Sequence, residues 1–186
     1  VNKNPDIFFV SVFDHARQTL EQESGKSYER DSQDVYAFRV VLDHLRAATF
    51  LIADGVFPSN KDQGYFVRRL IRRSVRFANQ LGIRSDICAR IGSCIVDAYK
   101  EAYPNLDAQR STILSELTKE ERKFKLTLQQ GVKKFEELAQ KTAESTISGT
   151  DAFDLLQSFG FPFELTQELA AERGLKVDLD AFKQEK

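Results

Sequence analysis

Apolar residues recur at intervals of three and four positions along almost the whole chain, and this spacing limits the fold more than any other feature. Because an α-helix completes a turn in 3.6 residues, the spacing is typical of amphipathic helices. The helical stretches are residues 6–23, 35–53, 64–81, 84–103, 107–141, 151–159, 164–173 and 178–184. An extended pattern occurs only at residues 174–177. The sequence therefore predicts an all-α fold.

The longest stretch, residues 107–141, predicts one long amphipathic helix, with Gly131 inside it as a candidate kink. A polar linker at residues 145–150 separates it from the short helices that follow. We therefore expect two domains. A helical domain over residues 1–144 carries the main function, and a smaller C-terminal helical subdomain over residues 145–186 packs on it.

Composition narrows the class of protein. Hydrophobic residues make up 41% of the chain and include 15 Phe, which is enough for a core and excludes wholesale disorder. No stretch approaches the roughly 18 consecutive apolar residues of a membrane helix, and no secretory leader is recognisable. We therefore expect a soluble, cytoplasmic protein without a membrane partner. The chain opens at Val1 and contains no Met, which predicts a segment of something longer.

The residue types that build catalytic and metal sites are sparse. Cys88 and Cys94 have no His nearby, and His15 and His44 are far apart, so neither pair has the spacing of metal ligands. No glycine-rich phosphate loop occurs. On a densely apolar helix, a hydrogen-bonded structural role for His44 is favoured over catalysis, and the two cysteines are best interpreted as small core residues. The sequence predicts no catalytic residue, cofactor or metal in this segment.

The net charge of −1 hides a strongly basic stretch, because residues 63–85 contain six arginines and no acid. Planar guanidinium groups on one rigid helix are suited to binding phosphates. The alternative is a helix face paired with carboxylates of the same protein, for which Asp43, Asp54 and the acidic C-terminal third are candidates. The charge pattern alone leaves both open. The five arginines on the helix are Arg68, Arg69, Arg72, Arg73 and Arg76.

A turn of short polar residues precedes this helix. Its sequence is Pro58-Ser59-Asn60-Lys61, and Gly64-Tyr65 follows closely. The Asn60 side chain offers two donors and an acceptor, which is what reading a base edge requires. The alternative is that Ser59 or Asn60 caps the helix, and the pattern alone favours capping.

Four segments together resemble the alanyl-tRNA synthetase family. Residues 40–60 read VVLDHLRAATFLIADGVFPSN and residues 64–76 read GYFVRRLIRRSVR. The family pattern is approximately ADHxRxxxFxIxDGxxPSNxxxGYxLRRxxRRxxR. Residues 120–124, EERKF, are similar to its EEExF helix, and residues 160–166, GFPFELT, to its YGFPxDLT segment. The matches occur in order over nearly the whole chain.

This resemblance implies the helical tRNA-recognition region that follows a class II catalytic domain. The expected partners are the acceptor stem of tRNA(Ala), with its G·U wobble pair, and the enzyme's own catalytic domain, but not DNA. ATP-dependent aminoacylation with Mg²⁺ would belong to that catalytic domain, and Zn²⁺ to an editing domain. Both would lie outside this segment.

The family reads the wobble pair with an Asn of the PSN turn and an Asp just before YGFP. The Asn maps onto Asn60, but the position of the Asp is occupied by Gln157, with Asp154 one turn earlier as a substitute. A neutral amide oxygen accepts a weaker hydrogen bond than a carboxylate. The resemblance assigns the tRNA backbone to Lys61 and the five arginines. Asp43, Ser59, Gly64 and Tyr65 are assigned supporting roles.

A second function, from a different class, fits the same residues. The segment would be a helical scaffold that docks the catalytic domain through its arginines and has little affinity for RNA of its own.

Overall fold

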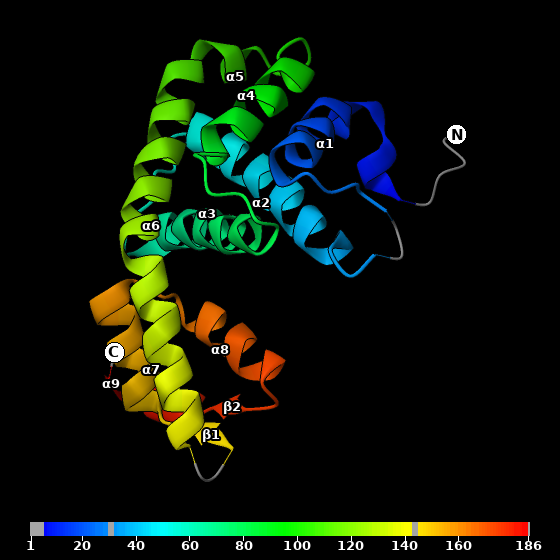
Figure 1. The fold of residues 1–186 in the computed structure, drawn as a ribbon. Helices are drawn as coiled ribbons and strands as arrows, with labels where there is room; N and C mark the ends of the chain where they lie inside the picture. The colour runs from blue at the N-terminus through cyan, green and yellow to red at the C-terminus, as the bar shows by residue number, and fades with distance from the viewer. Residues whose placement is uncertain (1–5, 30–31, 143–144, 186) are drawn as a thin grey trace. The chain divides into compact units, whose positions relative to one another are not determined.

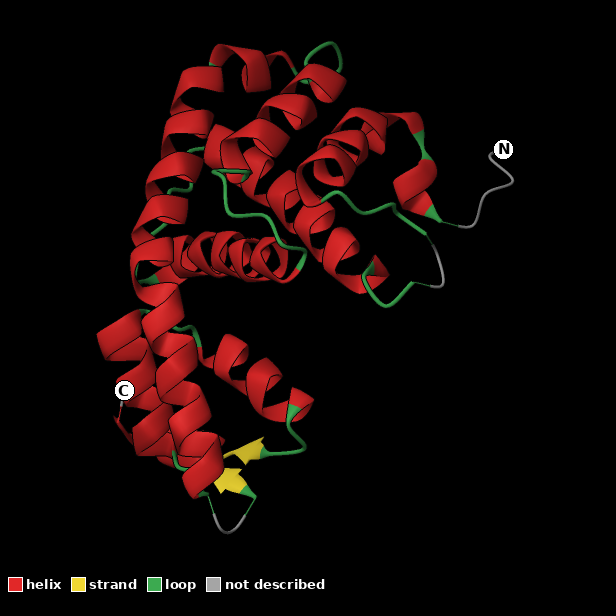
Figure 2. Ribbon diagram, in the orientation of Figure 1, coloured by secondary structure: helices red, strands yellow, loops and turns green. Residues whose placement is uncertain are grey.

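The computed structural model describes residues 6–29, 32–142 and 145–185. Almost all of its regular structure is helical, and two strands of two residues each are the exception among the described residues (Figures 1 and 2). The predicted all-α fold is confirmed. No helix in the described ranges has both the length and the apolar content needed to cross a bilayer.

The elements follow one another in a simple order. They are η1 (Ile7–Phe9), α1 (Ser11–Ser24), α2 (Val35–Ala53), α3 (Asp62–Gln80), α4 (Cys88–Tyr99), α5 (Pro104–Ala108), α6 (Arg110–Lys141), β1 (Thr146–Ile147), α7 (Gly149–Phe159), α8 (Phe163–Glu172), β2 (Lys176–Val177) and α9 (Leu179–Glu185).

The chain forms two compact units, Val1–Arg122 and Lys123–Lys186, and the long helix α6 contributes to both. The expected domain division between residues 144 and 145 stays a prediction, since a compact unit is not by itself an independently folding domain.

Helix α2 lies at the centre of the first unit. It packs against α3 and α4, while α1 packs mainly against α4 (Figure 1). Phe38, Leu42, Leu45 and Ile52 of α2 are buried almost completely, as the dense apolar pattern predicts. The apolar face of α3 is buried as well. Its buried residues include Val67, Leu70, Ile71, Ser74, Val75 and Ala78.

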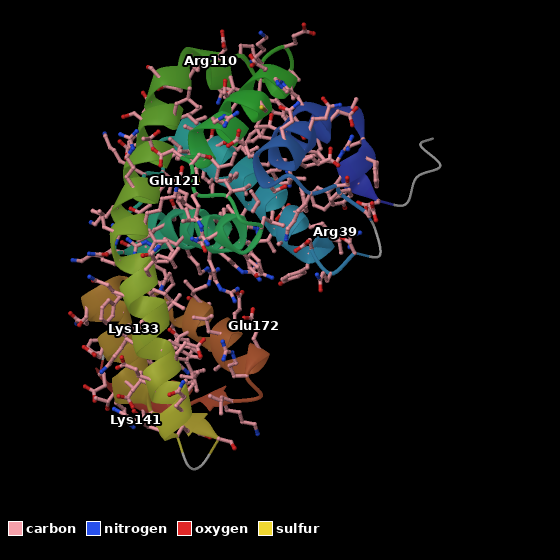
Figure 3. The ribbon with its side chains drawn as sticks, viewed as in Figure 1. Arg39, Arg110, Glu121, Lys133, Lys141 and Glu172 are labelled. Carbon is pink, nitrogen blue, oxygen red and sulfur yellow. The ribbon has the colours of Figure 1, made fainter. Side chains whose placement is uncertain are left out.

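The first predicted helix is interrupted, because Asp6 organises the chain before it. One carboxylate oxygen of Asp6 accepts from the Phe8 amide at 3.1 Å. The other accepts from the Tyr28 hydroxyl at 2.7 Å and from Arg39 at 2.8 Å (Arg39 is labelled in Figure 3). Burial by itself raises the pKa of Asp6, but these hydrogen bonds outweigh it and hold that pKa below its ordinary value. Helix α1 then begins at Ser11 instead of residue 6.

The helix predicted over residues 84–103 is shorter and begins at Cys88. The Ile87 and Cys88 amides donate to the two carboxylate oxygens of Glu121, at 3.0 and 2.8 Å. Glu121 is fully buried and comes from α6 (labelled in Figure 3), so a distant carboxylate caps α4. At the other end, Pro104 starts the separate helix α5. The prediction that the two cysteines are small core residues is confirmed, since both are free and buried.

The second unit contains α7, α8, α9 and a minimal parallel sheet in which Thr146 pairs with Lys176 and Ile147 with Val177. Ala152, Phe163 and Phe182 form its buried cluster. Strand β1 was not predicted, because two residues are too few to show a period of two.

Gly131 lies on the buried side of α6 in this unit, where a Cβ atom would stand 2.2 Å from the ring of Phe161. The glycine therefore makes room for Phe161.

Candidate nucleic-acid interface

The turn before α3 is closed by its own hydrogen bonds. The Ser59 amide donates to the Gly64 carbonyl at 3.0 Å, and the Ser59 hydroxyl donates to the Lys61 carbonyl at 2.9 Å. Lys61 is the N-cap residue of α3, and its side chain makes no capping hydrogen bond. Capping by Ser59 or Asn60, which the pattern alone favoured, is therefore wrong. Asn60 is left exposed in the turn.

Gly64 is required for this geometry. A Cβ atom there would lie 2.2 Å from Ser59 Oγ and 2.5 Å from the Phe57 carbonyl oxygen, far inside van der Waals contact. Ser59 and Gly64, which were both expected to have supporting roles, are thus in direct contact with each other. Ser59 directly precedes Asn60 in the chain.

Arg68 holds the side chain of Asn60. Its Nη1 donates to Asn60 Oδ1 across two turns of helix. A guanidinium group has only donors, so this contact fixes which end of the carboxamide faces Arg68. The carbonyl oxygen has two lone pairs and retains the capacity to accept a second donor.

Two of the predicted phosphate-binding arginines are buried. Arg72 is 4% exposed and Arg76 is 7% exposed. Arg72 Nε donates to Glu120 Oε1 at 2.6 Å, and Arg68 Nε lies 3.4 Å from the same oxygen. Burial lowers the pKa of Arg72 from its ordinary value, and Glu120 opposes that effect. The arginines therefore do have an internal carboxylate partner.

That partner is Glu120, which was not among the expected candidates Asp43, Asp54 and the acidic C-terminal third. The expectation for the C-terminal third stays a prediction. Asp43 instead lies beside His44 and Arg46, at 3.2 and 3.3 Å. Asp54 accepts from Asn105 at 3.5 Å. The interpretation of both aspartates as partners of the α3 arginines is wrong, because their side chains are occupied by neighbours on other elements or on α2 itself.

Arg73 makes ordered contacts with α2. Its Nη1 donates to His44 Nε2 at 2.6 Å and its Nη2 to the Tyr36 hydroxyl at 2.7 Å. Because Arg73 only donates, His44 accepts at Nε2 and carries its proton on Nδ1, which donates to Asp43. Burial and the nearby Arg73 charge lower the pKa of His44. His44 thus has the hydrogen-bonded structural role that the sequence favoured.

Four residues form a row at four-residue spacing along the helix and its N-cap. We call this row, which consists of Lys61, Tyr65, Arg69 and Arg73, the basic row. Lys61 is exposed and the other three are half-buried. The guanidinium of Arg69 lies over the exposed ring of Phe66, 4.9 Å from its centroid. The predicted basic residues therefore divide into this row and an internal group of Arg68, Arg72 and Arg76.

Gln157 lies on α7 in the second unit. Its side chain is exposed and makes no hydrogen bond to any residue that the structure describes. Asp154, the candidate substitute, accepts from Ser158 at 2.8 Å. Asn60 belongs to the first unit and Gln157 to the second.

Glu120 is the important residue that sequence reasoning missed. It belongs to the EERKF segment and occupies the apolar row of α6 that includes Ile113, Leu117 and Phe124. A carboxylate at an apolar position of a helix indicates a buried ion pair, because a buried charge requires a partner. Among residues 6–29, 32–142 and 145–185, no three His, Cys, Asp or Glu side chains gather as a metal site would require.

The sequence is similar to known proteins over its whole length. Residues 1–186 match the family model described as tRNA synthetases class II (A). An alanine–tRNA ligase of Borreliella afzelii is 42% identical over 178 residues, covering 95% of this chain and 30% of the relative. That of Staphylococcus epidermidis is 40% identical over 186 residues, covering 99% and 21%. That of Dehalococcoides mccartyi is 38% identical over 180 residues, covering 97% and 21%. The chain thus spans between a fifth and a third of the length of these relatives.

Proposed function

Because this chain belongs to the family of class II tRNA synthetases (A), we propose that it is the part of an alanine–tRNA ligase that binds the acceptor stem of tRNA(Ala). Within that stem it would read the G·U wobble pair. The chain would position the RNA for aminoacylation by a catalytic domain outside these 186 residues. ATP and Mg²⁺ would bind to that domain, and Zn²⁺ to an editing domain.

The observation that carries this proposal is the exposed Asn60, held in a closed turn with its carboxamide oriented by Arg68. A-form RNA presents a wide, shallow minor groove to a protein. A wobble pair leaves the guanine 2-amino group there without a partner, and this group needs an acceptor. The second lone pair of Asn60 Oδ1 supplies one.

The basic row would hold the stem in register. Contacts to phosphates position a nucleic acid without reading sequence, whereas contacts to base edges specify it. Lys61 lies in the turn itself, and the guanidinium of Arg69 lies over the exposed ring of Phe66. Burial removes Arg72 and Arg76 from this role. Lys61, Arg69 and Arg73 are therefore the phosphate-binding residues we propose.

One observation favours the second candidate, a scaffold with little RNA affinity. Arg68 and Arg72 are both directed to Glu120, so part of the arginine pattern serves contacts within the protein. Under this alternative the remaining arginines would also contact protein, namely the catalytic domain.

Measurements of RNA binding distinguish the two proposed functions. Two hairpins that differ only in one pair, G·U in one and G·C in the other, are titrated against the chain at several salt concentrations. If phosphates are bound, affinity falls steeply with salt. Asn60→Ala should reduce the G·U preference by roughly tenfold to a hundredfold, the cost of leaving a polar group unpaired.

Lys61→Ala should instead weaken both hairpins equally and reduce the salt slope by about one. Lys119→Ala removes another exposed lysine, from α6, and is the matched control. No binding at low salt would contradict RNA recognition and support the scaffold.

A further inference from the structure

We propose that Arg68 and Glu120 are positioning residues that fix the carboxamide of Asn60 for base reading, and that Arg68 does not bind phosphate. The inference rests on the proposed function. The observation that supports it is a series of contacts. Glu120 of α6 contacts Arg72 and Arg68 of α3, and Arg68 contacts Asn60 in the exposed turn.

The contacts begin at a buried ion pair. Glu120 is 5% exposed and its Oε1 accepts from Arg72 Nε at 2.6 Å. Arg72 is itself buried, and this hydrogen bond holds the carboxylate against its guanidinium. Glu120 is therefore a fixed negative charge.

Arg68 connects this ion pair to the exposed turn. Its Nε lies 3.4 Å from Glu120 Oε1, and its side chain is only 12% exposed. The far end of the guanidinium, Nη1, donates to Asn60 Oδ1. The guanidinium of Arg69, on the neighbouring row, lies instead over the exposed Phe66 ring. Adjacent arginines thus have different tasks.

Asn60 needs such a partner because its carboxamide has two chemically opposite ends. Rotation about the terminal torsion is broad and roughly two-fold, so an unheld Asn presents donors about as readily as its acceptor. A donor facing the guanine amino group would lose the discrimination on which reading depends. A guanidinium can hold only the oxygen end, which keeps the acceptor on the side of Arg68.

The test uses Arg68→Met, which keeps the long apolar stem and the Arg72–Glu120 pair, together with Glu120→Gln. Arg122→Met is the matched control, since Arg122 is an exposed arginine of α6 that pairs with Asp86 at 2.7 Å. Against the two hairpins, Arg68→Met and Glu120→Gln should each reduce the G·U to G·C affinity ratio by roughly fivefold to tenfold, the equivalent of one hydrogen bond. The G·C affinity should change less than twofold.

Equal losses for both hairpins in Arg68→Met would overturn the proposal and make Arg68 a phosphate ligand. An unchanged ratio would also overturn it. If Glu120→Gln fails to fold by circular dichroism, Arg68→Met decides alone, because it leaves the buried pair in place.

A second measurement separates this inference from the proposed function. The side-chain amide resonances of Asn60 in the free protein should shift in Arg68→Met and stay in place in Arg122→Met. If wild type shows no G·U preference but these resonances shift, the proposed function fails and the positioning contact stands. If they do not shift, the positioning contact is absent, whatever the RNA results.

Discussion

The two candidate base readers, Asn60 and Gln157, have very different surroundings. Asn60 lies in a turn closed by three local constraints: the Ser59 amide, the Ser59 hydroxyl and the absence of a side chain at Gly64. Its carboxamide is held by Arg68. Gln157 lies on the exposed side of α7 and is held by no described residue.

This difference affects how selectively each side chain can recognise a base. A preorganised group loses little conformational entropy when it binds, whereas an unheld Gln must lose the freedom of several torsions. The replacement of the family's Asp by Gln157 also substitutes a neutral acceptor for a charged one. We therefore expect recognition in this chain to depend mainly on the first unit.

The largest effect is expected from breaking the buried ion pair beneath Asn60. Glu120→Ala should lower the free energy of unfolding by about 3–5 kcal/mol, because it removes the buried carboxylate that pairs with the buried Arg72 guanidinium. The matched pair in the second unit is Glu136 with Arg173, whose side chains are 29% and 52% exposed. Glu136→Ala should cost only about 0.2–1 kcal/mol.

Urea denaturation of both variants measures this difference. Equal losses of unfolding free energy in the two variants would contradict the view that the two units are stabilised by different kinds of ion pair.

A smaller effect is expected from two glycines that admit close neighbours. Gly64→Ala and Gly131→Ala should each destabilise by about 1–3 kcal/mol, since the added methyl groups overlap Ser59 and Phe161 respectively. Only Gly64→Ala distorts the turn, so only this variant should lose the G·U preference. The check is hairpin binding at a temperature where both variants are folded. Loss of preference in Gly131→Ala would show that the second unit contributes more than we expect.

The pH dependence of the free energy of unfolding near neutrality should arise in the first unit, because this unit contains both histidines of the chain. Burial and Arg73 hold the pKa of native His44 below its ordinary value of 6.5. Below about pH 6.5 the unfolded chain therefore binds a proton that the native protein resists, and stability falls as the pH decreases. Denaturation at pH 7.5, 6.5 and 5.5 should show this loss in wild type and a flatter profile in His44→Gln. Identical profiles would exclude His44 as its source.

The smallest effect is expected from Gln157→Ala. Loss of an unheld neutral side chain should change the ratio of G·U to G·C affinity by no more than about twofold. Asp154→Ala serves as a control for the same helix face. A loss as large as that of Asn60→Ala would overturn the comparison and make Gln157 an equal reader.

Sequence periodicity predicted the architecture well, because the packing of α2 and α3 follows from which of their faces are apolar. It failed where a distant residue sets an element's boundary. Helix α4 begins at Cys88 because Glu121 of α6 caps it, and α1 begins at Ser11 because the segment before it is tied through Asp6 to Tyr28 and Arg39. Neither contact is visible in local spacing.

The sequence by itself determined the helical class, the inward faces and the Asn60 turn with its basic helix. Only the tertiary structure decided what each arginine does. Five guanidinium groups at helical spacing look equivalent along the chain, because their charges and local neighbours are alike. In the folded protein the buried Glu120 carboxylate lies 2.6 Å from Arg72 Nε and 3.4 Å from Arg68 Nε, while Arg69 and Arg73 are half-buried. The free energy of a charge depends on its burial and its partner, and both are set by the packing of residues distant in sequence.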